Sequence, residues 1–401
     1  MRKHLVWISS FLCLALGGDR LAGYFLGKIT DSSQFRYSRL YNSTEDADIL
    51  FVGNSRGLTF FQPEAERVTR LKTMNLSYNG MPADLAKCLV MDYLDRHKPP
   101  KLMVVDVTLC DRYNESLKTS MNLYTPYSAR LTELVKNSVA LKMQEGNSTE
   151  VEVLDKYAGS KVYYGGLVSH LYKYNSEVFQ RVLYHRNKTD EDWLIDRVIG
   201  EQATKDTSFR SYQVRMFPTM AAHLKEMIDY AKAKGVEVKL VINPYFPQFA
   251  ETIKDSFLTP LKTHIETITS LPVNDFSTAL SNVDEIGDYQ HANKKGSIRY
   301  MNILLQNGIL TDDTANMGYK TMPTNMENVK PSSVFISENM APTQKKMPEV
   351  IPVQPEGKEI DPSVSNPISS VSPPFMDKKI RKKRRWQSDY GFAVDTLFSN
   401  Y

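Results

Sequence analysis

The chain has 401 residues and a net charge of +4, from 50 Lys and Arg against 46 Asp and Glu. Its 41 % apolar and 24 % charged residues are ordinary for a chain that buries a core, which excludes a wholly disordered protein, a collagen-like fibre and a polytopic membrane protein. The small positive excess is evenly spread and predicts no nucleic-acid partner. Three cysteines without metal-type spacing and seven scattered histidines predict no metal site.

The amino terminus is typical of an export signal. The basic residues Arg2–His4 precede an uncharged run, Leu5–Leu16, as in the first two regions of a secretory signal. This run is shorter than the ~20 residues of a spanning helix, but apolar residues resume at Leu21. Residues 1–28 are therefore predicted to be a cleaved signal peptide or a retained signal anchor, with a buried amphipathic helix as the alternative. For either signal we expect a domain outside the cytoplasm, anchored on the periplasmic side of the cell membrane or secreted.

Short apolar runs then alternate with helical patterns. Strands are predicted over 48–53, 71–76 and 101–107, and apolar residues at helical spacing predict a helix over Ala83–Arg96. Alternation of strands and helices in units of about 30 residues favours a parallel sheet. Outside the cytoplasm Cys88 and Cys110 are candidates for a disulfide, which only their geometry decides.

Residues 110–212 interrupt this alternation with largely helical patterns, which predict a helical insertion near the carboxyl edge of the sheet. The fold class is therefore predicted to be α/β, a three-layer α/β/α sandwich over residues 29–312 with a five-stranded, mostly parallel sheet. The later elements are predicted as a helix over 212–234, a strand over 236–242, a helix over 247–269, a strand over 272–276 and a helix over 294–306.

The composition changes after Asp313. Residues 313–375 hold ten of the 20 prolines and show almost no periodicity, so residues 313–401 are predicted to be a disordered tail. A basic cluster, Lys378–Arg385, lies within this tail. One interpretation is contact with anionic lipid or an acidic polymer, and the other is a solvated tail without a partner.

Three motifs follow predicted strands. Gly53-x-Ser55 follows the first strand, Gly80 lies in the turn after the second, and Asp288-x-x-His291 follows the last. Ligands of open α/β sheets bind at the carboxyl ends of the strands. A serine in such a turn is a candidate nucleophile, and an aspartate near a histidine can hold the imidazole in one tautomer. Taken singly, the motifs also fit a helix-capping serine, a tight turn and a chance pair.

Taken together, the motifs resemble the SGNH (GDSL-like) hydrolase superfamily over about residues 45–308. The run Ala47–Arg56 and the short apolar segment before it are most similar to the membrane-anchored periplasmic branch associated with cell-surface polysaccharide modification. That branch includes relatives of alginate acetylation proteins and of the D-alanine transfer protein of teichoic acid.

The resemblance implies a role for each matching residue. Ser55 attacks an acyl carbonyl, His291 accepts its proton, and Asp288 orients His291. The backbone amides of Ser55 and Gly80 form the oxyanion hole. No cofactor is implied by this chemistry.

One block of the superfamily is missing. Its third block is a Gly-x-Asn-Asp after strand three, whose asparagine completes the oxyanion hole, but here the strand ends in Val105-Asp106-Val107-Thr108. Asp106, Asn114 and Asn243 are candidates for the vacant role, and none matches the motif.

The leading functional hypothesis is a serine esterase or O-acyltransferase that acts on acyl groups of an envelope or extracellular polysaccharide. Its partners are then an acylated glycan or acyl donor and, through the amino-terminal segment, the membrane. The alternative is a catalytically inactive binding or assembly factor of a polysaccharide biosynthesis or export system, with polysaccharide-assembly proteins as partners. The missing third block favours the alternative, and the complete Ser, Asp and His set favours catalysis.

Overall fold

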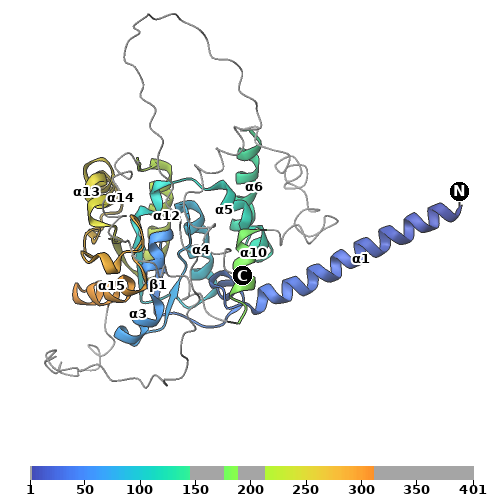
Figure 1. Ribbon diagram of the computed structural model, residues 1–401, viewed down its shortest axis with the longest axis horizontal. Helices are drawn as coiled ribbons and strands as arrows, with labels where there is room; N and C mark the ends of the chain where they lie inside the picture. The colour runs from blue at the N-terminus through green and yellow to red at the C-terminus, as the bar shows by residue number, and fades with distance from the viewer. Residues whose placement is uncertain (1, 145–175, 188–212, 311–401) are drawn as a thin grey trace, which may run out of the picture. The chain divides into compact units, whose positions relative to one another are not determined.

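The computed structural model of the chain describes residues 2–144, 176–187 and 213–310 (Figure 1). The insertion expected over 110–212 is described in part. The tail expected over 313–401, with its basic cluster, lies outside the described residues. The expected domain boundaries therefore stay predictions.

A parallel sheet forms the centre of the described chain. Its five strands are β1 (Ile49–Val52), β2 (Thr73–Asn75), β3 (Leu102–Asp106), β4 (Glu237–Ile242) and β5 (Val273–Asp275). They lie in the order β2-β1-β3-β4-β5, and each neighbouring pair is parallel. This confirms the predicted α/β class, and it is an order in which ligands bind beyond the carboxyl ends of the strands.

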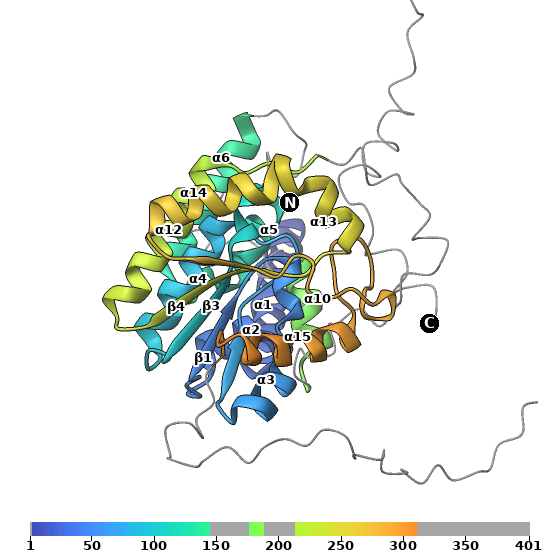
Figure 2. The same cartoon turned by 90° about the vertical axis from the view of Figure 1, so that its left-hand side faces the viewer.

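Helices cover both faces of the sheet, as the alternation of strand side chains requires. Ile49 and Phe51 pack with α3 (Gln62–Thr69) and α15 (Lys294–Gln306). Their neighbours Leu50 and Val52 belong to the larger core under α4 (Ala83–Arg96), α12 (Pro218–Ala233) and α14 (Thr259–Thr269). Figure 2 shows α3 and α15 on one side of the strands and α12 and α14 on the other, which confirms the three-layer sandwich.

Two helix predictions need correction. The helix expected over 247–269 is divided by a π-helical turn, Lys254–Leu258, because Pro260 in the next turn has no N–H to continue the α-helical hydrogen bonds. The helix expected from residue 212 begins at Pro218, whose fixed backbone angle favours the first helical position.

The described part of the insertion is helical, as expected. It consists of α5 (Glu115–Ser120), the 3₁₀ turn η3 (Met121–Tyr127), α6 (Ala129–Gln144) and α10 (Glu177–Tyr184). The remaining elements are α1 (Arg2–Ser32), α2 (Arg36–Asn42), η1 (Ser55–Thr59), η2 (Val107–Asp111), α13 (Pro247–Ile253), the π-helical turn η6 (Lys254–Leu258) and η7 (Val283–Glu285).

The amino-terminal helix α1 is longer than the apolar run that predicted it. Within Lys3–Ser32 an 18-residue window has a mean hydropathy of 1.4 and is not buried, so the helix is long and apolar enough to cross a membrane. Just beyond it, Ser33 Oγ donates to the Val182 carbonyl at 2.9 Å, and the Gln34 amide donates to the His185 carbonyl at 3.0 Å. The helix is compatible with a membrane anchor and with a signal sequence.

Cys88 and Cys110 do not form a disulfide. Both are free and buried, Cys88 in α4 and Cys110 in η2. Burial raises the pKa of the Cys88 thiol to about 12, and burial also raises the pKa of Cys110. Both are therefore protonated and unreactive packing residues at neutral pH.

The last described residues belong to the core, which generates a truncation test. Ile309 and Leu310 are buried against α15, and both amides donate to the Leu304 carbonyl. We expect a chain ending at residue 312 to keep the free energy of unfolding of the full chain, measured in detergent solution. A chain ending at residue 307 loses two buried aliphatic side chains, which contribute about 1.5–3 kcal/mol each. Equal stability of the two truncated chains, or failure of the chain that ends at residue 312 to fold, would contradict the predicted domain boundary at residue 312.

Candidate functional site

The candidate nucleophile lies in a tight turn between β1 and η1. Asn54 holds this turn, since its Oδ1 accepts from the Arg56 amide at 3.0 Å. The turn is closely packed, because a Cβ added at Gly53 would lie 2.7 Å from the Gly57 Cα. Ser55 begins η1 and is 7 % exposed, and its hydroxyl has no hydrogen-bond partner within the described ranges.

A second turn, after β2, lies against the serine turn. The Tyr78 amide donates to the Gly53 carbonyl at 3.3 Å, which joins the two turns through the backbone. Gly80 follows with φ +67°, a left-handed conformation that favours glycine. The backbone N–H groups of Ser55 and Gly80 donate to no acceptor in the part of the chain that is described. The oxyanion hole that the resemblance implies requires two such donors, and this role of the two amides stays a prediction.

The predicted Asp–His pair forms in the loop between η7 and α15. His291 Nδ1 lies 2.7 Å from Asp288 Oδ1, and the same oxygen accepts from the Gln290 amide at 2.9 Å. The Gly287 amide donates to the His291 carbonyl at 2.9 Å and closes the loop. Because a carboxylate oxygen accepts, Nδ1 carries the proton of the neutral imidazole and Nε2 is then the acceptor nitrogen. Nε2 is buried without a hydrogen-bond partner among the described residues.

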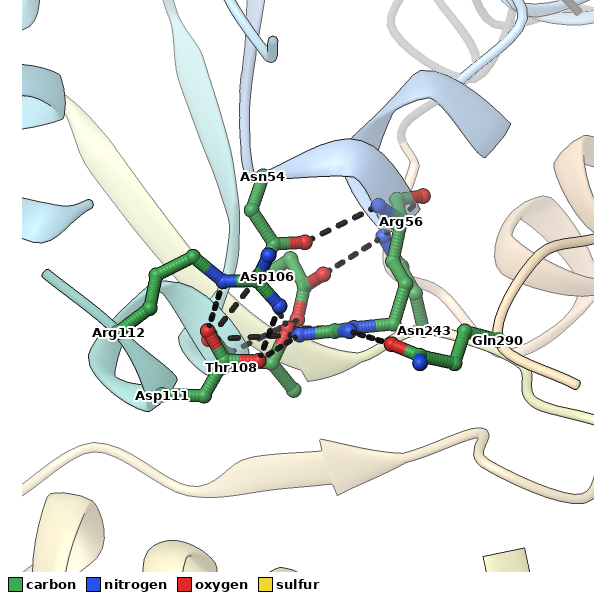
Figure 3. Close-up of polar contacts among 8 residues, drawn as sticks. All are labelled: Asn54, Arg56, Asp106, Thr108, Asp111, Arg112, Asn243 and Gln290. Atoms are coloured by element: carbon green, nitrogen blue, oxygen red, sulfur yellow. Dashed lines mark hydrogen bonds and ion pairs between the residues drawn. The ribbon is translucent and has the colours of Figure 1, made fainter. Parts of the chain in front are cut away.

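A buried arginine links the serine turn to this loop (Figure 3). Arg56, next to Ser55, is 1 % exposed and donates from Nη1 to Gln290 Oε1 at 3.2 Å. Its Nη2 lies 2.7 Å from Asp111 Oδ2, and its Nε donates to Thr108 Oγ1 at 3.0 Å. One guanidinium therefore connects the turn after β1, the turn after β3 and the loop that carries His291.

The ion pair beneath the turn stays charged at neutral pH. Burial alone would lower the pKa of Arg56, but the nearby negative groups, Asp111 and Asp106 among them, outweigh it and raise that pKa further. Burial would raise the pKa of Asp111, but the charges of Arg112 and Arg56 outweigh it and lower that pKa to about 2. For Asp106, burial prevails and raises the pKa.

Two of the three candidates for the missing asparagine are engaged in the interior. Asn243 is fully buried, and its Nδ2 donates to the Arg56 carbonyl at 3.1 Å while its Oδ1 accepts from Tyr300 Oη at 2.8 Å. Asp106 is also fully buried and accepts from the Thr108 amide at 3.0 Å. Both residues use their side chains on interior partners around the serine turn.

The third candidate, Asn114, lies beside the candidate oxyanion hole. Its Nδ2 donates to the Gly80 carbonyl at 3.0 Å, and its Oδ1 accepts from the Leu117 amide at 3.0 Å. This pair of bonds fixes the orientation of the amide, and the second Nδ2 hydrogen is left for another acceptor. Asn114 is half-buried, unlike the two interior candidates.

The three motifs thus meet at one edge of the sheet. No hydrogen bond joins Ser55 Oγ to His291 Nε2 in the described chain, although catalytic hydrogen bonds are often long before substrate binds. The described residues also contain no cluster of three His, Cys, Asp or Glu side chains that could hold a metal ion.

Sequence reasoning overlooked the residues that connect the motifs. Arg56 directly follows the Gly53-x-Ser55 motif, and Gln290 lies inside the Asp288-x-x-His291 motif. Asp111 lies 55 positions from its partner Arg56. Buried charges are paired, but a charged residue in a turn is ordinarily exposed, so the sequence does not show that Arg56 is buried. Neither its burial nor its partner could therefore be predicted from the sequence.

The buried pair generates a stability prediction. We expect Arg56→Met to lower the free energy of unfolding by about 3 kcal/mol or more, because it removes one member of a buried ion pair. The matched control is Arg67→Met in α3, whose partner is Glu64 and whose side chain is 65 % exposed. Exposed pairs contribute less than about 1 kcal/mol. Denaturant unfolding of both variants measures the difference, and equal losses would contradict the importance given to Arg56.

Comparisons with known proteins place few constraints on this chain. No family model and no curated protein matches the sequence. Among solved structures, a proposed acylhydrolase from Bacteroides fragilis NCTC 9343 is similar over 69 % of this chain and 96 % of its own, with a TM-score of 0.32 and 12 % identity. A likeness this low identifies neither a family nor an activity, so the fold assignment rests on the order and direction of the strands.

Proposed function

We propose that the chain is a serine esterase or O-acyltransferase that acts on acyl groups of an envelope or extracellular polysaccharide. The observation that carries the proposal is the oriented Asp288–His291 pair, with Nδ1 and Oδ1 2.7 Å apart and Nε2 left as an acceptor. The hydrogen bond between Arg56 and Gln290 holds this pair near the turn that bears Ser55.

The reaction proceeds through an acyl-enzyme. Ser55 Oγ attacks the acyl carbonyl, and His291 Nε2 accepts the hydroxyl proton and returns it to the leaving alcohol. Water or an acceptor hydroxyl then gives its proton to Nε2 and attacks the acyl-serine, and the proton passes back to Ser55 Oγ as the acyl–oxygen bond breaks. Asp288 stabilises the imidazolium in both steps.

The oxyanion of each tetrahedral intermediate is bound by donors at the same edge. The Ser55 and Gly80 amides supply two, and Asn114 Nδ2 supplies the third in place of the missing asparagine. The short distance between Asn114 and Gly80 supports this assignment, since Nδ2 lies 3.0 Å from the Gly80 carbonyl oxygen.

The polysaccharide substrate and the location rest on other features. The similarity of Ala47–Arg56 to the polysaccharide-associated SGNH branch supports an acylated glycan. The length and hydropathy of α1 support a membrane anchor, and the basic residues Arg2 and Lys3 favour a cytoplasmic amino terminus. The catalytic domain then lies on the periplasmic side.

A second candidate function is a non-catalytic assembly factor with the same fold. Two observations favour it: the third sequence block is absent, and Ser55 and His291 share no hydrogen bond in the described chain. Reaction with a fluorophosphonate distinguishes the two functions, because the probe reacts only with an activated serine.

Substitutions in the triad test the catalytic proposal. We expect Ser55→Ala to abolish fluorophosphonate labelling and hydrolysis of an acyl ester, at a cost of at most about 1 kcal/mol in stability. His291→Ala has a similar effect on activity, because nucleophile and base act as one unit. Asp288→Asn is milder if another group holds the imidazole.

The control for this series is Ser128→Ala, which removes a serine that caps α6 by accepting from the Leu131 amide at 3.0 Å. This variant is expected to label at the wild-type rate. Ester hydrolysis by a folded Ser55→Ala protein would refute the nucleophile assignment, and a wild type that never labels would favour the assembly factor.

A reporter fusion tests the location. We expect a reporter joined after residue 320 to be active only if it is of a type that functions outside the cytoplasm, and removal of residues 2–28 to abolish that activity. Activity of a cytoplasm-only reporter at the same position would show that the orientation is wrong. Recovery of the full-length protein in the membrane fraction would support an anchor over a cleaved signal.

A further inference from the structure

Gln290 stands between the two residues of the Asp–His pair but contacts a different part of the molecule. Its side chain extends toward Arg56, as Figure 3 shows, and Oε1 accepts from Nη1 at 3.2 Å. Its backbone amide donates to Asp288 Oδ1 at 2.9 Å. The residue thus contacts both the orienting carboxylate and the element that carries the candidate nucleophile.

The other member of this contact is fixed in place. Beyond the bonds of Arg56 to Asp111 and Thr108, its guanidinium carbon lies 5.0 Å from the centre of the Tyr245 ring. Tyr245 is fully buried and follows β4. The Arg56 guanidinium is held by groups that follow β3 and β4 and has little freedom to move. The hydrogen bond from Arg56 to Gln290 therefore restrains the position of the loop that carries His291.

The loop also has backbone contacts, within itself and to the segment after β4. The Gly287 amide bonds to the His291 carbonyl, and Ile286 pairs with Ala292 in an isolated bridge. A further backbone bond, from Phe246 to the Tyr289 carbonyl at 3.0 Å, ties the loop to the segment after β4. These contacts shape the loop, whereas the Gln290 side chain connects it to the residue beside Ser55.

We propose that Gln290 is a positioning residue for the Ser55–His291 pair and acts through Arg56. The inference rests on the proposed function. The bond between Arg56 Nη1 and Gln290 Oε1 sets the distance from Ser55 Oγ to His291 Nε2, and Gln290 takes no part in proton transfer. A charged donor strengthens the bond, and a displacement of about 1 Å between reacting groups can cost up to about 100-fold in rate.

The test distinguishes the effect of the Gln290 accepting oxygen from the effect of the size of its side chain. Gln290→Met keeps the length of the side chain and removes the acceptor, whereas Gln290→Glu keeps an acceptor at the same reach. Gln306→Met, at the exposed end of α15, is the matched control for introducing a methionine. Two measurements apply to every variant of the full chain: hydrogen exchange of residues 283–293, and the kinetics of fluorophosphonate labelling and acyl-ester hydrolysis.

We expect Gln290→Met to exchange faster over 283–293, to label about 10- to 100-fold more slowly, and to lose kcat with KM within about twofold of the wild type. Gln290→Glu is expected to recover most of the labelling rate and the exchange protection, and Gln306→Met to match the wild type. A role limited to stability would lower the melting temperature without this division between kcat and KM.

Three outcomes would contradict the positioning role of Gln290. Unchanged exchange in Gln290→Met, or labelling at the wild-type rate, would overturn the positioning role while the esterase proposal stands. Failure of Gln290→Glu to recover activity would show that the accepting oxygen is not what matters. A wild type that never labels would overturn the proposed function and with it the catalytic role of Gln290, whatever the exchange data show.

Discussion

The candidate site depends on one buried cation. The Arg56 guanidinium is almost fully removed from water and is balanced by Asp111 at 2.7 Å, with Arg112 on the other side of the same carboxylate. Such a charge is stable inside a protein only when its partners are held in place. The turns that follow β1 and β3 and the loop before α15 must therefore keep a common arrangement, and that arrangement is what places Ser55 near the Asp–His pair.

The candidate site combines a buried support with a partly exposed Asp–His pair. Arg56, Asp106 and Asn243 are buried and use their polar groups on one another, which fixes the backbone of the serine turn. Asp288 and His291 are partly exposed, with side-chain accessibilities of 27 % and 23 %. The buried groups supply position, and the Asp–His pair lies nearer the surface, although Ser55 and the Nε2 atom of His291 are themselves buried.

Much of the fold was predictable from the sequence because its signals are local. The helix over Ala83–Arg96 was predicted with its observed bounds, since apolar spacing and Pro99-Pro100 define it within a short window. The Asp288–His291 pair was predictable because three positions separate its members. The roles of Asp111 and Gln290 were not, because they depend on contacts 55 and 234 positions away in the chain. Only the tertiary structure shows that Asn114 is half-buried beside Gly80, whereas Asn243 and Asp106 lie in the interior.

The most direct test of this account is a crystal structure of the full chain after reaction with a fluorophosphonate. The account predicts a covalent bond from phosphorus to Ser55 Oγ, with the phosphonyl oxygen accepting from the Ser55 and Gly80 amides. It also predicts His291 Nε2 within hydrogen-bond distance of the adduct and an intact Arg56–Gln290 bond. A label on another residue, or a His291 ring remote from the adduct, would contradict it.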